Sequence, residues 1–300
     1  MKEKYETEIK KNIDISVRNK YGDNPDEIIV KRIDDEWEAM TRNRVFPDIS
    51  AFLELTGWLN ENSHPYCMRS VSGSSFILYL LGITAGNPLP PHRYCPKCRK
   101  VHWEPEFIDG FDIPLNRYCE TDGFLLQPDG HDIPWQTVWG YDGFQPLLTI
   151  DLSPALLEPV HNEIIPYLAG KYDLGEYINN PHEDDTGRIE LGNLGVSFTL
   201  GEDSDIPVTG NRASDTIVFR DDIFSYLIKH GFSEYDAWFG MTRVRKGRGL
   251  PTVTEEMLKS QDSWIISFCN DIEYLPPKAH AVEDILFKMP LIWNAFAAEV

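Results

Sequence analysis

The stretch from Arg69 to Asp151 constrains this chain most, because three patterns that carry chemistry follow one another within it. It opens on a Ser/Gly-rich turn over 70–75 that leads into an apolar helix over 76–83. It continues through a Cys-Pro-Lys-Cys sequence at 95–98 and closes on the β-type segment 147–152. Small residues before a helix let backbone N–H groups converge on an anion, although such turns more often simply cap the helix. A phosphate-binding turn, a metal knuckle and an acidic strand, in this order, suggest nucleotide chemistry.

Cys95 and Cys98 have the spacing of one half of a structural zinc site. The second half should bring another Cys-x-x-Cys about twenty residues later. At that distance the sequence has Cys119 and, three residues on, Asp122. A carboxylate oxygen is a legitimate zinc ligand, so the four residues predict a three-thiolate, one-carboxylate zinc site, with His102 as an alternative fourth ligand. A metal-free relic of such a site is the other interpretation.

The acidic strand carries only part of what two-metal phosphoryl transfer needs. That chemistry requires two carboxylates that converge on a pair of ions, and Asp-x-Asp on a strand places both on one face. Here the sequence is Thr149-Ile150-Asp151, so the first position has no charge. Glu190 and Asp142 are the candidates for a further carboxylate.

Composition limits the compartment and the partners. The chain of 300 residues is 42% hydrophobic, enough for a sizeable core. It has no apolar run that predicts a membrane span, no apolar signal core at its N-terminus and an odd number of cysteines, so we expect a cytoplasmic protein. A net charge of −20 weighs against nucleic-acid binding over the whole surface, unless positive charge is locally concentrated. Such a concentration exists at 243–248, where four of six residues are Arg or Lys.

Periodicity and turn signals predict helices at both ends of the chain and short strands between them. The expected helices cover 5–19, 26–40, 49–58, 76–83, 221–230, 234–244 and 255–271, with a terminal helix after the prolines at 276 and 277. The expected strands cover 147–152, 188–191 and 196–200.

Taken together, these blocks resemble the polymerase core of the PolC-type DNA polymerase III alpha subunit, the bacterial C-family replicase. The strings Asn87–His92 and Gly130–Pro134 are the most specific. The similar blocks, in family order, are Tyr21–Ile29, Arg69 with Ser72–Phe76, Gly82–His92, Cys95–Cys98, Gly110–Pro114, Asp129–Pro134, Arg220–Ile223, Val244–Gly247 and Pro277–Ala281.

The resemblance implies an α+β fold with a mixed or antiparallel palm-like sheet of the nucleotidyltransferase type, flanked by helices. A small zinc-knuckle insertion and a helical C-terminal part would complete it. The expected division is an N-terminal helical part of palm or thumb (1–65), the Ser/Gly motif with knuckle and palm strand (66–152), a shortened palm remainder (153–215) and a helical fingers-like part (216–300).

The resemblance also implies roles for individual residues. Asp151 would be the surviving palm aspartate, with Glu190 as a possible helper, and would bind Mg²⁺ if the protein is active. Cys95, Cys98, Cys119 and Asp122 would hold structural zinc. The residues implied to bind nucleotide are Arg69, Ser72, Gly73 and Ser74 at the triphosphate, and Arg220, Arg245, Lys246, Lys278 and His280 on the fingers side.

Departures from the family pattern shape the expected function. Thr149 stands in place of an aspartate, Ser70 in place of a glycine and Asp122 in place of a cysteine, and the span from Asp151 to Arg220 is shorter than the family's. We expect no counterpart of the family's amino-terminal exonuclease or of its carboxy-terminal clamp- and template-handling parts. We therefore expect a catalytically impaired homologue that retains binding of dNTP, DNA or replication proteins.

Two alternatives are an active minimal DNA-directed DNA polymerase with a rearranged two-metal site and a folded product without function. In the first, Asp151 would pair with Glu190, Asp142 or another acidic residue.

Overall fold

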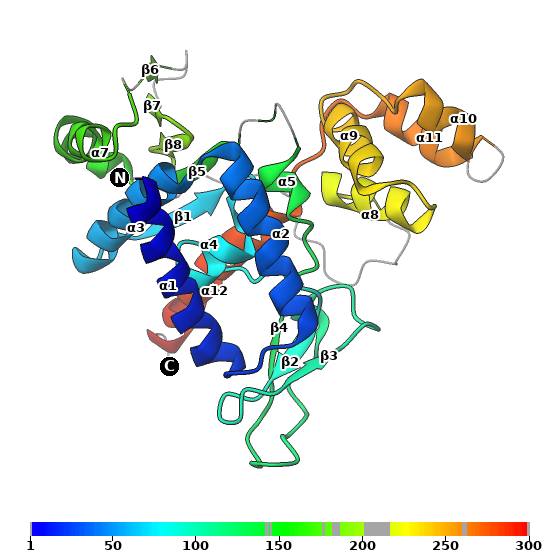
Figure 1. Cartoon of the computed structure of the whole chain (residues 1–300), viewed down its shortest axis with the longest axis horizontal. Coiled ribbons are helices and arrows are strands. Elements are labelled where there is room, and N and C mark those ends of the chain that lie inside the picture. Colours follow the sequence, from blue (N-terminus) through cyan, green and yellow to red (C-terminus); the bar gives the residue numbers. More distant parts are fainter. Residues whose placement is uncertain are drawn as a thin grey trace.

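The computed structural model describes residues 2–141, 144, 146–175, 178–181, 187–200, 217–259 and 263–298. Helices and two small sheets alternate along the chain, which confirms the α+β class (Figure 1). The helices are α1 (Lys2–Tyr21), α2 (Glu27–Asn43), α3 (Phe46–Glu61), α4 (Phe76–Leu80), α5 (Gln136–Trp139), α6 (Leu157–Pro159), α7 (Ile165–Tyr172), α8 (Arg220–Lys229), α9 (Glu234–Val244), α10 (Thr252–Leu258), α11 (Ser263–Asp271) and α12 (Lys278–Ala298). The strands are β1 (Tyr66–Arg69), β2 (His92–Tyr94), β3 (Val101–Trp103), β4 (Gln127–Asp129), β5 (Leu148–Leu152), β6 (Ile178–Pro181), β7 (Gly187–Leu191) and β8 (Leu194–Ser197). Short 3-10 turns are η1 (Ser72–Ser74), η2 (Gly110–Asp112) and η3 (Pro154–Leu156), and η4 (Val160–Ile164) is a π-helical turn.

The larger sheet is mixed, with the strand order β1-β5-β8-β7-β6. β5 runs antiparallel to β1 and parallel to β8, and the remaining pairs are antiparallel. Because successive side chains of a strand point to opposite faces, the sheet has two chemically different sides. Leu148, Ile150 and Val196 belong to the hydrophobic core, whereas Thr149 and Asp151 point to the opposite face.

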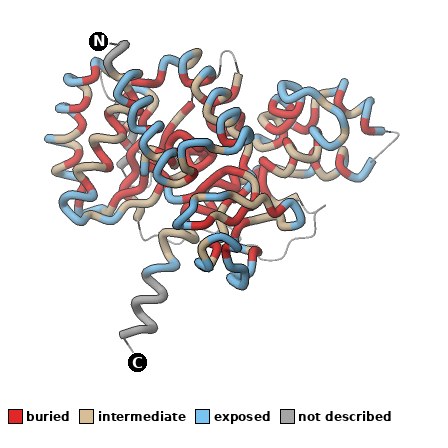
Figure 2. Tube along the Cα trace, turned by 60° about the horizontal axis from the view of Figure 1, so that its bottom comes forward, coloured by how far each residue is buried: buried red, intermediate tan, exposed pale blue. Residues whose placement is uncertain are grey.

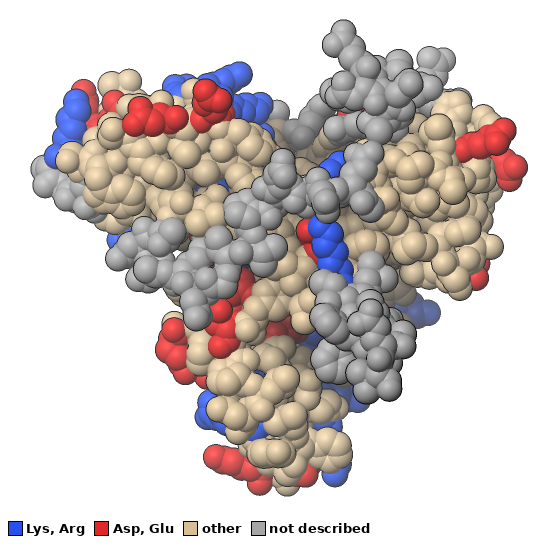
Figure 3. All heavy atoms as spheres, turned by 180° about the vertical axis from the view of Figure 1, so that it is seen from behind, with Lys and Arg blue, Asp and Glu red and all other residues tan. Residues whose placement is uncertain are grey.

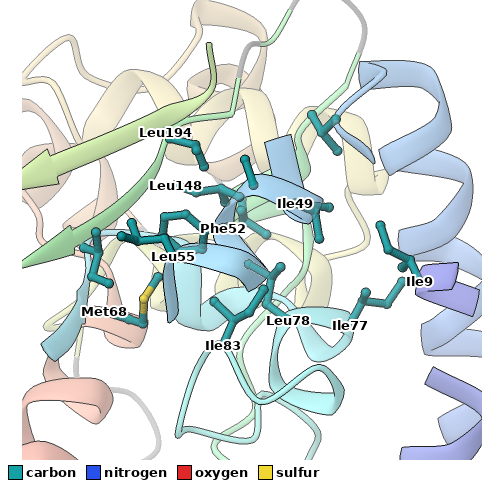
Figure 4. Close-up of a cluster of buried hydrophobic side chains, with 14 of the residues drawn as sticks. Ile9, Ile49, Phe52, Leu55, Met68, Ile77, Leu78, Ile83, Leu148 and Leu194 are labelled. Carbon is teal, nitrogen blue, oxygen red and sulfur yellow. The ribbon is translucent and has the colours of Figure 1, made fainter. Parts of the chain in front are cut away.

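The main core lies between this apolar face and the N-terminal helices (Figure 4). Phe52 and Leu55 of α3 pack there against Leu148 and Leu194 of the sheet, and all four are fully buried. Burying one large apolar side chain stabilises the fold by about 1.5–3 kcal/mol, so this layer fixes the position of β5. In Figure 2 the buried residues run through the middle of the molecule.

The helices α8–α11 form a second group with its own hydrophobic core, seen at the right of Figures 1 and 2. The described side chains of α12, up to residue 290, do not join this core. α12 packs against β1 and η1, and its residues Ala279 and Val282 form a small apolar cluster with Ile133. The C-terminal helix therefore covers β1 and the Ser/Gly turn, at the start of the stretch from Arg69 to Asp151.

Two helix predictions need correction. The helix expected over 76–83 ends at Leu80, because Gly82 adopts a left-handed conformation (φ +72°) and the N–H of Ile83 donates to the carbonyl oxygen of Leu78, as in a Schellman cap. The helix expected over 255–271 is two helices, since α10 ends at Leu258 and α11 begins at Ser263. Positions 260–262 lie outside the described residues.

The strings Asn87–His92 and Gly130–Pro134 pair with each other through backbone hydrogen bonds. The N–H groups of His131, Asp132 and Ile133 donate to the carbonyl oxygens of residues 87, 89 and 88, each over 2.9 Å. These strings thus join the small sheet β3-β2-β4 to the main body. Within the described residues, no helix combines the length and the apolar character needed to cross a membrane.

Candidate nucleotide site and metal centre

Asp151 lies on the polar face of the larger sheet and is only 7% exposed. The Nε of Arg69 lies 2.9 Å from its Oδ2, and the Nη1 of Arg69 donates to the Oγ1 of Thr199 over 3.0 Å. Strand register explains the contact between Arg69 and Asp151. Arg69 is opposite Thr149 on the neighbouring strand, and Asp151 is two residues beyond Thr149, so both side chains lie on the same face of the sheet. A guanidinium group thus lies against the carboxylate that the sequence assigned to a metal.

β8, the other neighbour of β5, has no carboxylate opposite Thr149 or Asp151. Ser197 is opposite Asp151, and Gly195 is opposite Thr149. Glu190 is opposite Gly195 and therefore two strands from β5, a backbone separation of about 10 Å at about 4.8 Å per strand. The ions of a two-metal site are only about 3.5–4 Å apart, so Glu190 is poorly placed to share them with Asp151. Asp142 lies outside the described residues.

Across the described part of the chain, no group of three or more His, Cys, Asp or Glu ligand atoms gathers around Asp151. A magnesium pair therefore does not fit the described residues of this face.

The Ser/Gly turn is buried beneath α12. Ser72 and Ser74 have no exposed surface, and the backbone N–H of Thr149 donates to the Oγ of Ser72 over 2.9 Å. A β-carbon at Gly73 would lie 3.0 Å from side-chain atoms of Glu283, so glycine permits a close approach of α12. Ser70, where the resemblance implies a glycine, has a left-handed backbone (φ +59°) that glycine adopts at lower cost.

Two backbone cradles next to this turn are occupied by carboxylates of the chain itself. At the N-terminus of α4, the N–H groups of Phe76 and Ile77 donate to Glu36 over 2.8 Å and 3.2 Å. In the following loop, the N–H groups of Ala85 and Gly86 donate to Glu283 over 3.1 Å and 2.8 Å. In both places the converging backbone N–H groups already donate to a carboxylate of the chain itself, Glu36 or Glu283.

Four of the predicted nucleotide-binding side chains are linked electrostatically, because Arg220 acts on Arg245, and Arg69 and Arg220 act on His280. Burial, together with the charge of Arg220, lowers the pKa of Arg245 to about 10. Burial lowers the pKa of His280 to about 4, and the charges of Arg69 and Arg220 contribute to this shift. The Nε atoms of Arg220 and Arg245 are buried and have no hydrogen-bond partner in the described part of the chain. We call Arg69, Arg220, Arg245 and His280 the basic cluster.

The two predicted lysines lie elsewhere. Lys278 is 5% exposed, and its Nζ lies 3.0 Å from the Oδ2 of Asp109 and donates to the backbone oxygen of His131. The Nδ1 of His131 in turn lies 2.8 Å from the Oδ1 of Asp109. This buried network joins α12 to the small-sheet region, so Lys278 has a structural role here. Lys246 is exposed on the surface after α9.

The four predicted metal ligands do converge. The ligand atoms of Cys95, Cys98, Cys119 and Asp122 all lie within 4.8 Å of one another. The Sγ atoms of Cys98 and Cys119 are 3.6 Å apart, and the Oδ2 of Asp122 lies 3.5 Å from the Sγ of Cys95. Bonds of about 2.3 Å to a tetrahedral zinc ion would separate two sulfur atoms by about 3.8 Å. These residues therefore fit a tetrahedral metal ion.

Local backbone geometry supports the same conclusion. The N–H of Cys98 lies 3.4 Å from the Sγ of Cys95, and backbone N–H groups of Asp122 and Thr121 lower the pKa of the Cys119 thiol. His102, the alternative fourth ligand, does not belong to the group of converging ligand atoms. We call Cys95, Cys98, Cys119 and Asp122 the metal knuckle.

Sequence reasoning missed Glu36 and Glu283, the two internal anions. A signal for both was present, because each glutamate lies at an apolar-face position of its helix. Glu36 follows Ile29 and Ile33 at helical spacing, and Glu283 lies between Ala279 and Leu286. A charged residue on the buried face of a helix needs an internal partner.

Comparisons with known proteins agree with the family pattern of these blocks. The chain is 35% identical to DNA polymerase III PolC-type of Thermotoga petrophila over 144 residues, or 47% of this chain and 10% of that protein. It is 30% identical to the protein of the same name from Lacticaseibacillus paracasei over 225 residues, or 66% of this chain and 15% of that protein. The Streptococcus thermophilus protein of this name is 35% identical over 125 residues, or 41% of this chain and 8% of that protein.

No protein-family model matches the chain. The chain spans between 8% and 15% of the length of these relatives, and identities of 30–35% were found over up to two-thirds of its own length. The chain is therefore a divergent, partial homologue of PolC-type DNA polymerase III.

Proposed function

We propose that this chain is a catalytically impaired homologue of the polymerase core that retains binding of nucleotide phosphates. In this proposal the larger sheet corresponds to a nucleotidyltransferase palm and α8–α11 to fingers. One observation carries the loss of activity: the side chain held against Asp151 is the guanidinium of Arg69, 2.9 Å away. A second carboxylate would be needed in such a position to hold two mutually repelling ions.

The basic cluster supports the retained binding. Guanidinium groups pair with phosphate oxygens through charge-assisted hydrogen bonds, and a buried arginine Nε without a partner favours such a ligand. Figure 3 shows a few Lys and Arg atoms, with Asp and Glu atoms beside them, near the middle of the face opposite to that in Figure 1. An acidic protein needs a local concentration of positive charge, such as the basic cluster, to attract a polyanion. The relatives are named DNA polymerases, so dNTP and DNA are the ligands we propose, with replication proteins as possible further partners.

The metal knuckle supports a structural role for Zn²⁺. Three thiolates and one carboxylate leave no open position for a reacting ligand, which is the pattern of structural rather than catalytic zinc. In this proposal zinc holds the small-sheet region together and takes no part in any reaction.

We predict that the purified protein with Mg²⁺, dNTPs and primed DNA extends no primer. The physical reason is that a single carboxylate paired with an arginine cannot position two metal ions. The measurement is a gel-based primer-extension assay, with the Asp151→Asn variant prepared in parallel to expose contaminating polymerase. Extension by the wild-type protein that disappears in Asp151→Asn would establish the active alternative and overturn the proposal.

We predict that the protein nevertheless binds dATP in the absence of metal, and that binding weakens as salt concentration rises. Arg245→Gln should weaken it by about 10–100-fold, since a hydrogen bond to a charged group contributes about 1.5–3 kcal/mol. Isothermal titration calorimetry at two salt concentrations measures both effects.

Lys229→Gln, on the exposed surface of α8, is the matched control and should bind like the wild type. Equal affinities of Arg245→Gln and Lys229→Gln would exclude the basic cluster as the phosphate site. Because this assay needs no catalysis, it tests the binding proposal independently of primer extension.

A further inference from the structure

A pocket of about 380 Å³ lies beside the edge strand of the larger sheet, between β1, the loop after α4 and α12. Its volume is within the range of about 300–1,000 Å³ that is typical of small-molecule sites. Apolar side chains form much of its wall, including Tyr66, Ile83, Leu286 and Phe287. No residue of the basic cluster or of the metal knuckle lines it.

Glu283 is one of the residues that line this pocket, and only 4% of it is exposed. Its hydrogen-bond donors are the backbone N–H groups of Ala85 and Gly86. Within the described residues, no Lys or Arg forms an ion pair with it. Burial raises the pKa of Glu283 to about 7, against the opposing effect of these two N–H groups. A buried acid without a cationic partner is an unusual feature, because buried charges are normally paired.

A second polar group in the pocket lacks a partner. Thr84 is 5% exposed, and its buried Oγ1 forms no hydrogen bond with any described residue. Leaving a buried hydroxyl unsatisfied costs about 1–3 kcal/mol. A ligand that hydrogen bonds to this hydroxyl would recover that cost.

We propose that this pocket binds a small organic cation with an apolar body, of the aromatic amine or amidine class. Its charged head would pair with the carboxylate of Glu283 and hydrogen bond to the Oγ1 of Thr84. Its body would contact Leu286 and Phe287. The proposal goes beyond nucleotide binding, because the ligand has the opposite charge to a phosphate.

The groups that surround Glu283 reinforce the preference for a cation. From β1, Tyr66 and Cys67 have raised pKa values, through burial first and the charge of Glu283 second, so both are neutral at physiological pH. Asp284 of α12 and Asp151 of β5 also raise the pKa of Cys67, whereas Arg69 of β1 lowers it. Arg69 pairs with Asp151 and Lys288 pairs with Asp284, each over 2.9 Å, so Glu283 is the acid of this group that has no cationic partner among the described residues. His64 lines the pocket as well.

Benzamidine is a suitable probe, and neutral benzamide is its near-isosteric control. In calorimetric titrations of the full chain we expect saturable one-to-one binding of benzamidine, with benzamide at least about tenfold weaker, because a charge-assisted hydrogen bond is about twice as strong as a neutral one. Benzamidine stays protonated between pH 6 and 8.5, so its affinity should rise with pH as Glu283 ionises near pH 7 and then level off. No saturable binding at millimolar benzamidine would overturn the proposal.

Variants locate the site. Glu283→Gln should weaken benzamidine binding by at least about tenfold and abolish its pH dependence, with circular dichroism verifying the fold. Thr84→Val keeps the carboxylate and should weaken binding while preserving the pH dependence, so it remains informative if Glu283→Gln does not fold. Glu256→Gln, an exposed position on α10, is the control. Wild-type affinity in both pocket variants would show that benzamidine binds elsewhere and would exclude this pocket.

Discussion

Removing metal from the knuckle should unfold the small-sheet region while the main body stays folded. The hydrophobic cluster within this region consists of Cys95, Cys119 and Leu126 in the described structure, and two of these three residues are proposed metal ligands. So small a core cannot stabilise a fold by itself, whereas structural zinc contributes apparent binding free energies of about 10–16 kcal/mol in zinc-finger peptides. We expect one Zn²⁺ per chain and, after chelation, rapid proteolysis confined to residues between 92 and 129.

Cobalt substitution can count the ligands, because the intensity of thiolate-to-cobalt charge transfer depends on the number of bound sulfur atoms. Cys119→Ser should lose the ion, and Asp122→Cys should bind it more tightly with stronger absorption, since it completes a four-thiolate site. His102→Asn should leave binding unchanged, because that side chain lies outside the group of converging ligand atoms. Cys269→Ser, a buried thiol of α11, is the cysteine control. Full zinc occupancy in Cys119→Ser would refute this site.

Replacing Glu36 by alanine should lower the free energy of unfolding by about 3–5 kcal/mol, the usual effect of breaking a buried ion pair. Glu36 has no exposed surface, and Arg32 of the same helix donates to it over 2.5 Å. Alanine would leave a partly buried guanidinium and several buried donors without their acceptor. The other donors to Glu36 are Ser75 Oγ at 2.6 Å, Phe76 N at 2.8 Å, Ile77 N at 3.2 Å and Trp139 Nε1 at 3.2 Å.

A loss of this size is a large fraction of the about 5–15 kcal/mol that stabilises a typical protein. Urea unfolding followed by circular dichroism measures it. Glu38→Ala, two positions along α2 on the exposed side, should change stability by no more than about 0.5 kcal/mol. A decrease of less than about 1 kcal/mol in the free energy of unfolding of Glu36→Ala would mean that water replaces the carboxylate. In that case α4 would not depend on Glu36.

Glu36 also explains why the Ser/Gly turn could not be interpreted from the sequence alone. Small residues before an apolar helix do predict an anion-binding N-terminus, and the structure has one. The anion, however, belongs to a residue about forty positions earlier in the chain, since the hydrogen bond from Phe76 spans 40 residues. Which anion fills such a cradle depends on long-range packing, and local composition carries no information about it.

The sequence by itself determined the local elements and the ancestry of the chain. Helical spacing predicted α1, α2 and α9, and the apolar segment 147–152 predicted β5, because periodicity reflects which side of an element is buried. The spacing of three cysteines and Asp122 predicted a ligand set that does converge, because a Cys-x-x-Cys turn fixes the distance between its two sulfur atoms almost without tertiary context.

Tertiary structure alone decided which charges meet. It placed Arg69 against Asp151, enclosed Lys278 with Asp109, and brought Arg220 close enough to Arg245 to lower the pKa of that side chain. These outcomes depend on strand register and on the packing of α12, which join positions far apart in the sequence. Electrostatic energy depends on distance and burial rather than on order along the chain, so the sequence could name the candidate charges and only the fold could pair them.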